Sequence, residues 1–149
     1  MIKFTHTNLI AKDWERLAAF YEKVFGCIRI LPERDLSGKW IDDATALLNV
    51  NIKGIHLRLP GYGDTGPTLE IFQYNKKADW KKAGINQFGF AHIAFAVDNI
   101  EQAVNGLIKE GGSLVGKITT TNIRGAGTIT FVYARDPEGN IIELQKWNK

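Results

Sequence analysis

The sequence contains one cysteine, Cys27, so a framework of intrachain disulfide bonds is excluded. So little cysteine is typical of a reducing compartment, and we expect a cytoplasmic protein. The first residues lack the apolar run of a signal peptide, so we expect no secretory leader. No window approaches the ~20 apolar residues of a membrane-spanning helix, and no membrane partner is expected.

The sequence also lacks a block of charge of one sign. Its 19 basic and 16 acidic residues are interspersed and give a net charge of +3. Without a basic stripe there is no electrostatic footprint for nucleic acid, so we expect a small-molecule substrate. The 149 residues, of which 44% are hydrophobic, suffice for one ordinary domain with a real core.

A strand-then-helix pattern occurs twice along the chain. Alternation predicts a strand over residues 3–10 and another over 88–98, each followed by apolar residues at helical spacing. When His92 is aligned with His6, the same spacing brings Asn99 over Asp13, two good helix caps. It also brings Gly112 over Gly26, where we expect the helices to stop.

The repeat extends to the end of each half. The stretch 66–71 matches 139–144, which aligns Glu70 with Glu143. The first half is longer, and we expect its extra length to form a short helix within 36–51. The remaining strands are predicted at 28–34 and 52–59 in the first half and at 113–117 and 128–134 in the second.

These elements predict an α+β fold of two βαβββ modules. A half of this kind cannot close a core alone, so we expect a curved mixed sheet around one cleft, with the helices outside. Module 1 covers about residues 1–75 and module 2 about 88–149, joined by a polar linker over 76–87. Together they form a single domain over 1–149.

Four residues occupy matching places in the two halves: His6, Glu70, His92 and Glu143. The period of two in a strand puts both glutamates on the face opposite the apolar residues, toward the cleft. Buried carboxylates must be paired or coordinated, and two carboxylates converging with two imidazoles would bind a divalent Ni, Co, Mn, Fe or Zn ion. Four ligands leave positions open for substrate. The alternative is that both glutamates face solvent on edge strands and both histidines are structural.

Further side chains are candidates for contact with substrate. Arg58 is placed to hold a substrate anion or else to be a solvated strand residue, and Arg124 lies in a glycine-rich loop that we expect to cover a ligand. Phe72 and Tyr74 would form an aromatic wall, although packing explains them equally well. His56 has no counterpart in the repeat, and we expect it to be structural or exposed.

Three segments carry a family resemblance: 6–9 with Asp13, 89–94, and 136–144, which includes Asp-Pro-Glu-Gly-Asn. As a set they resemble the vicinal oxygen chelate superfamily, which includes glyoxalase I (lactoylglutathione lyase), methylmalonyl-CoA epimerase, extradiol dioxygenases and fosfomycin-resistance proteins. The resemblance covers nearly the whole chain. It implies paired βαβββ modules and metal ligands at His6, Glu70, His92 and Glu143.

The ligand set resembles that of glyoxalase I. This implies a metal-dependent lyase or isomerase that removes a proton α to a carbonyl and forms a metal-stabilised enediolate. Glu143 or Glu70 would be the base, and we favour Glu143. The alternatives are an epimerase of the methylmalonyl-CoA type, an extradiol-type dioxygenase, and a non-enzymatic binding protein of the bleomycin-resistance type.

Two positions depart from the resemblance. Bacterial glyoxalase I would have an arginine at Ile10 and an asparagine at Tyr74, and the arginine would bind glutathione. The sequence therefore leaves open whether glutathione or another thiol takes part, as well as the substrate and the metal. The resemblance also implies a homodimer, with the site formed within one chain or across two.

Overall fold

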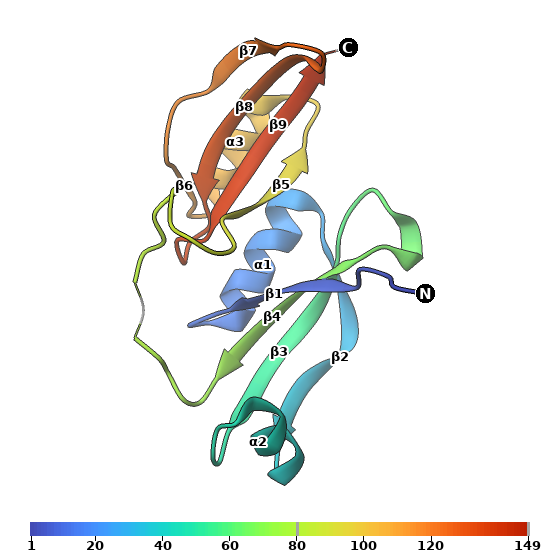
Figure 1. Ribbon diagram of the computed structural model, residues 1–149, viewed down its shortest axis with the longest axis vertical. Coiled ribbons are helices and arrows are strands. Elements are labelled where there is room, and N and C mark those ends of the chain that lie inside the picture. The colour runs from blue at the N-terminus through green and yellow to red at the C-terminus, as the bar shows by residue number, and fades with distance from the viewer. Residues whose placement is uncertain (80, 149) are drawn as a thin grey trace. The chain divides into compact units, whose positions relative to one another are not determined.

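The computed structural model describes residues 1–79 and 81–148. The chain divides into two compact units, Met1–Trp80 and Lys81–Lys149. The described residues form two mixed sheets and three α-helices, with one long helix in each unit (Figure 1). The predicted α+β class is confirmed.

The first unit holds a four-stranded sheet in the order β1-β4-β3-β2. Strands β1 and β4 are parallel, and the other neighbours are antiparallel. The elements are β1 (His6–Ile10), α1 (Trp14–Phe25), β2 (Ile28–Ser37), α2 (Lys39–Thr45), β3 (Asn51–Arg58), the 3₁₀ turn η1 (Gly63–Thr65) and β4 (Thr68–Tyr74).

The second unit repeats this order with β5-β9-β8-β6, and β7 also pairs with β8. Its parallel pair is β5 with β9. The elements are β5 (His92–Ala96), α3 (Ile100–Lys109), β6 (Ser113–Leu114), β7 (Thr119–Ile123), β8 (Gly127–Arg135) and β9 (Ile141–Asn148).

The register of the parallel strands confirms the internal repeat. In the first unit His6 lies opposite Thr68, and in the second His92 lies opposite Ile141. Two residues further on, Glu70 and Glu143 occupy the same place in their pairs. The alignment made from sequence therefore matches the two sheets residue for residue along these strands.

Both long helices begin at the predicted caps. The Asp13 carboxylate accepts from the backbone N–H of Arg16, and the Asn99 side chain accepts from that of Gln102, at 3.1 and 2.8 Å. α1 ends at Gly26, whose φ of 68° is the left-handed value that glycine tolerates. In the second unit the left-handed glycine is Gly111 rather than the predicted Gly112.

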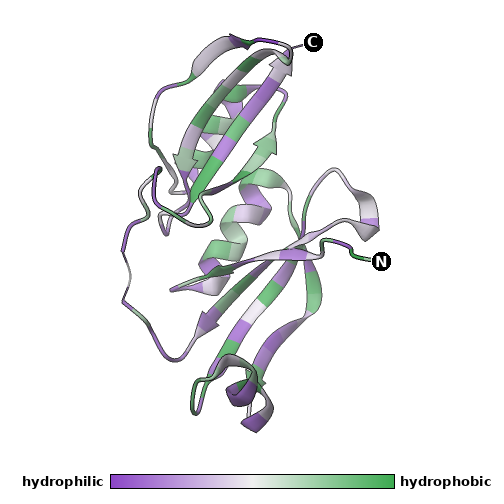
Figure 2. Ribbon diagram, viewed as in Figure 1, coloured by the Kyte–Doolittle hydropathy of each residue, from purple (hydrophilic) through white to green (hydrophobic). Residues whose placement is uncertain are grey.

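Each helix covers the apolar face of its own sheet. The predicted core residues Leu69, Ile71, Ile142 and Leu144 are at most 1% exposed. Figure 2 shows the corresponding alternation of hydrophobic and hydrophilic residues along β9. Because successive side chains point to opposite faces, the glutamates between these residues lie on the face away from the helix.

The helix predicted within 36–51 is α2, and it packs on the face that α1 leaves open. Ile41 of α2 is buried against Val50, Ile52 and Phe72, with Leu36 and Tyr74 beside them. The loop after α2 is held by Asp42, whose carboxylate accepts from the backbone N–H groups of Asn49 and Val50. These two bonds lower the pKa of Asp42.

The outer strand of the second sheet differs from the prediction. The strand expected over 113–117 is only the two-residue β6, and β7 was not expected. Both pair with β8, much as the single strand β2 pairs with β3 across a register shift between Ile30 and Arg34. The outer strand is thus irregular in both units and fully divided in the second.

No helix among the described residues is long and apolar enough to cross a bilayer. Cys27 lies in the core, at 4% exposed. Burial raises the pKa of its thiol to about 11, and the nearby Glu22 carboxylate adds to the shift.

Gly54 of β3 allows the close approach of β4, and we predict that Gly54→Ala destabilises the protein by about 2–3 kcal/mol. A Cβ there would overlap the carbonyl oxygen of Ile71 and lie 2.5 Å from Phe72 Cδ1. Gly106 in α3 is the matched control, because a Cβ there meets nothing within 4 Å. Gly106→Ala should raise the free energy of unfolding, by about 0.5–1 kcal/mol. Equal effects of the two substitutions in urea unfolding would contradict this account.

Candidate functional site

The first unit brings His6 and Glu70 together on the open face of its sheet. β1 and β4 are hydrogen-bonded neighbours. Asn8 lies opposite Glu70, and His6 lies two residues before Asn8, on the same face of β1. The distance from His6 Nε2 to Glu70 Oε2 is 3.8 Å. The Glu70 side chain is 13% exposed and that of His6 is 43% exposed.

Two further side chains hold the Glu70 carboxylate. Asn8, directly opposite on β1, donates from Nδ2 to Oε2 at 2.8 Å. His56, directly opposite on β3, places Nε2 2.9 Å from Oε1. Both carboxylate oxygens of Glu70 are therefore engaged by neighbouring strands.

His56 is in turn oriented by the hydroxyl of Thr68, which lies 3.3 Å from its Nδ1. Burial lowers the pKa of His56, and the Glu70 carboxylate opposes this shift only in part. A neutral imidazole protonated on Nε2 satisfies both contacts, because it donates to Glu70 and accepts from Thr68. Asn8, His56 and Thr68 thus fix the orientation of Glu70.

The second unit pairs His92 with Glu143 in the same way but with fewer neighbours. His92 Nε2 lies 3.0 Å from Glu143 Oε2, and their side chains are 30% and 13% exposed. Ala94 stands opposite Glu143 where Asn8 stands opposite Glu70. Tyr133 takes the place of His56, and its ring centroid lies 5.3 Å from that of His92.

Neither glutamate lies on an edge strand. β4 runs between β1 and β3, and β9 runs between β5 and β8. With both carboxylates mostly covered, the alternative in which they face solvent at a sheet edge is wrong. A carboxylate in such a place needs a partner of opposite charge or a hydrogen-bond donor, and here each has a histidine.

Each unit supplies one imidazole nitrogen donor and one carboxylate oxygen donor. Within residues 1–79 and 81–148, no group of three or more histidine, cysteine, aspartate or glutamate side chains is gathered so that it could hold a metal ion. The donor types nevertheless fit a divalent transition metal, and both glutamates lie close to a histidine without a lysine or arginine partner in the described chain. Each unit by itself therefore supplies two of the four donors that the sequence predicts.

The two predicted arginines lie at turns. Arg58 ends β3, and its Nη1 lies 2.7 Å from Asp64 Oδ1 in the turn η1, while its buried Nε has no hydrogen-bond partner. Arg124 lies in the glycine-rich turn of the hairpin between β7 and β8. That turn is at the far end of β8 from Tyr133 and the His92–Glu143 pair.

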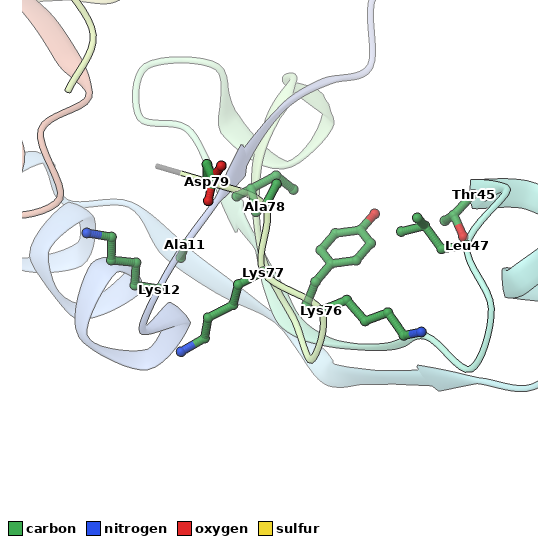
Figure 3. Close-up of a pocket in the computed structure, with 10 residues that line it drawn as sticks. Ala11, Lys12, Thr45, Leu47, Lys76, Lys77, Ala78 and Asp79 are labelled. Carbon is green, nitrogen blue, oxygen red and sulfur yellow. The ribbon is translucent and has the colours of Figure 1, made fainter. Parts of the chain in front are cut away.

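The two predicted aromatic residues follow Glu70 on the same face of β4. Phe72 is 9% exposed and packs under α2, with its ring edge-on to that of His56 at 6.1 Å. Tyr74 lines a pocket of about 740 Å³ at the end of the strand (Figure 3). The pocket is lined by Ile10, Ala11, Lys12, Thr45, Leu47, Tyr74, Lys76, Lys77, Ala78 and Asp79.

Sequence reasoning missed His56. We expected it to be structural or exposed, because the repeat gives it no histidine counterpart. The structure places it against Glu70. The available signal was its position on a strand antiparallel to the one that carries Glu70, because cross-strand neighbours in such a pair lie side by side.

The fold and the two matched His–Glu pairs define a class of protein. Residues 3–144 match the Glyoxalase/Bleomycin resistance protein/Dioxygenase superfamily, and the chain belongs to it. This is the vicinal oxygen chelate superfamily that the sequence resembles, and that prediction is confirmed.

Individual relatives share only a modest fraction of their residues with this chain. The chain is 26% identical to the lactoylglutathione lyase of Escherichia coli O157:H7 over 144 residues, which are 96% of this chain and 91% of the relative. A glyoxalase family protein from Bacillus cereus superposes with a TM-score of 0.85 at 20% identity, over 100% of this chain and 96% of that one. A glyoxalase I mutant from Zea mays gives a TM-score of 0.66 at 21% identity, over 96% of this chain and 44% of that one.

The unequal surroundings of the two glutamates predict unequal effects of mutation. His56→Phe leaves one carboxylate oxygen of Glu70 without its donor, and should lower the free energy of unfolding by about 1–3 kcal/mol. Tyr133→Phe, at the matching place in the second unit, should cost less than about 1 kcal/mol. Denaturant unfolding measures both. Equal costs would mean that His56 does not support Glu70.

Proposed function

We propose that the protein is a divalent-metal-dependent lyase or isomerase of the glyoxalase I type, which removes a proton α to a carbonyl. The observation that supports this most is the pair of His–Glu sets in identical strand registers, each with a mostly covered carboxylate. An imidazole beside a mostly covered carboxylate is the kind of nitrogen and oxygen donor set that divalent transition metals take. The lactoylglutathione lyase relatives support the same class of chemistry.

His6, Glu70, His92 and Glu143 would hold the metal. Two nitrogen and two oxygen donors suit Ni, Co, Zn, Mn or Fe(II), and the two carboxylates balance the charge of a divalent ion. The bound ion would supply Lewis acidity toward the oxygen atoms of the substrate. The remaining roles fall to the side chains of this chain.

Glu143 is the better candidate for the base. A base must leave its resting contacts to reach the substrate proton, and in the described residues the ion-pair partner of Glu143 is His92 alone. Glu70 is tied on both oxygens by Asn8 and His56. We therefore assign Glu70 to holding the site together and Glu143 to proton transfer.

The identity of the substrate is a separate matter from the reaction class. The relatives are named for a glutathione-derived substrate, whereas Ile10 and Tyr74 offer apolar surface where the resemblance implies polar side chains. We therefore propose a carbonyl compound with an acidic α-proton, without assigning glutathione to it.

We predict that Glu143→Gln lowers solvent-proton exchange into small 2-oxo or thioester substrates by about 10²–10⁴-fold. The amide keeps the shape of the side chain but cannot accept the proton. Exchange is followed by NMR in deuterated water with the metal-loaded protein. Glu101→Gln, an exposed substitution in the first turn of α3, is the control and should leave exchange unchanged.

We predict that Glu70→Gln mainly weakens metal binding, by about tenfold or more, because it removes a ligand charge. Elemental analysis of the purified protein and calorimetric titration with Co²⁺ measure this. A protein that binds no divalent metal, or that keeps normal exchange in both glutamine variants, would falsify the proposal. Oxygen consumption with Fe(II) would indicate ring-cleaving dioxygenase chemistry instead.

A further inference from the structure

The pocket at the end of β4 combines an apolar wall with a positive rim. Its wall includes Ile10, Ala11, Leu47, Ala78 and the ring of Tyr74. Three lysines and one aspartate also line it, so the lining carries an excess of positive charge. A volume of about 740 Å³ lies within the usual range for small-molecule sites.

The rim of the pocket is fixed by hydrogen bonds of the surrounding loops. Asn75 accepts from the backbone N–H of Asn51 and donates to the carbonyl of Asn49, which ties the end of β4 to the loop after α2. Asp42 holds the same loop from the other side through Asn49 and Val50. The loop that carries Leu47 is therefore held at its end by hydrogen bonds.

The three lysines of the lining extend to different sides (Figure 3). Figure 3 shows Lys76 extending toward the side of Thr45 and Leu47, while Lys12 and Lys77 lie on the side of Ala11. Neither Lys76 nor Lys77 forms an ion pair among the described residues. The charge of Lys76 is nevertheless near enough to Asp42 to contribute to the lowered pKa of that carboxyl group. Both ammonium groups are exposed and can contact a bound anion.

The pocket lies on the same face of the sheet as Glu70. Glu70, Phe72 and Tyr74 alternate along β4, as do His6, Asn8 and Ile10 along β1, so all six point to one side. Tyr74 follows Glu70 by about 13 Å at ~3.3 Å per residue. The pocket and the carboxylate therefore lie on one face of the first sheet, and Phe72 stands between Tyr74 and Glu70 on β4.

We propose that this pocket binds the tail of the substrate, and that the tail is an organic anion: a carboxylate, phosphate or sulfonate on an apolar, aromatic or aliphatic body. The apolar wall takes the body, and Lys76 and Lys77 take the charge. A strongly hydrophilic tail would leave its polar groups unpaired against Ile10, Leu47 and Tyr74. That this ligand is the substrate rests on the proposed function, whereas the binding preference does not.

Two matched dyes test the binding preference without metal or turnover. 1-Anilinonaphthalene-8-sulfonate carries a sulfonate, and N-phenyl-1-naphthylamine has the same ring systems without it. Fluorescence titration is done on the full chain in the presence of a chelator. We expect the double variant Lys76→Gln with Lys77→Gln to bind the sulfonate about tenfold more weakly and the neutral dye unchanged.

Two further variants locate the site. Lys81→Gln with Lys82→Gln removes two charges from the exposed segment that follows, outside the pocket lining, and should leave both dyes unaffected. Leu47→Asn should weaken both dyes, because it removes apolar wall. Circular dichroism checks that each variant is folded.

The proposal is overturned if the sulfonate binds the Lys76/Lys77 variant as tightly as the native chain, if the control pair weakens it equally, or if Leu47→Asn has no effect. If the dye results are as expected but the protein shows no metal-dependent proton exchange, the proposed binding site stands and the proposed reaction is wrong.

Discussion

A glutamate in the middle of a central strand must find a partner, and the structure depends on how each unit supplies one. The first and last strands of each unit are parallel neighbours, although at least one helix and two strands separate them in sequence. This pairing sets a histidine from one strand beside a glutamate from the other. The long helix of each unit covers the opposite face with apolar contacts, so the polar pair lies on the face away from that helix.

The two copies share a framework but differ in the side chains around the carboxylate. Asn8 and His56 surround Glu70, and Ala94 and Tyr133 stand in the same places around Glu143. A carboxylate that is held on both oxygens is suited to a fixed structural role. One with a single polar contact can change its orientation at lower cost, because it has fewer hydrogen bonds to break.

The sequence was informative wherever a period or a repeat specified the answer. The alternation around Leu69 and Leu144 predicted the buried faces, and the repeat predicted which histidine accompanies which glutamate. Contact between His56 and Glu70 depends on the register of an antiparallel pair, which alternation within one strand does not determine. β7 was missed because Thr119 to Asn122 are polar on both faces, so no alternation marks the strand.

The linker shows a different limit of sequence reasoning. Residues 76–79 are polar and lack any regular pattern, so they were predicted only to join two modules. Their backbone nevertheless returns beside β1 and α2 and forms one wall of a cavity. Composition indicates that a segment is exposed, but it does not indicate which surface the segment passes over.

Among the described residues α2 has no counterpart in the second unit, and this makes the two ends of the first sheet different. Ile41 and its neighbours cover the open face around Phe72, and among the described residues of the first unit no helix packs at the other end, near His6. A molecule lying along β4 therefore meets a barrier at one end only. The distance from that barrier to Glu70 is fixed by the sheet. The length of the bound molecule, rather than its width, would therefore decide whether its reactive end reaches the carboxylate.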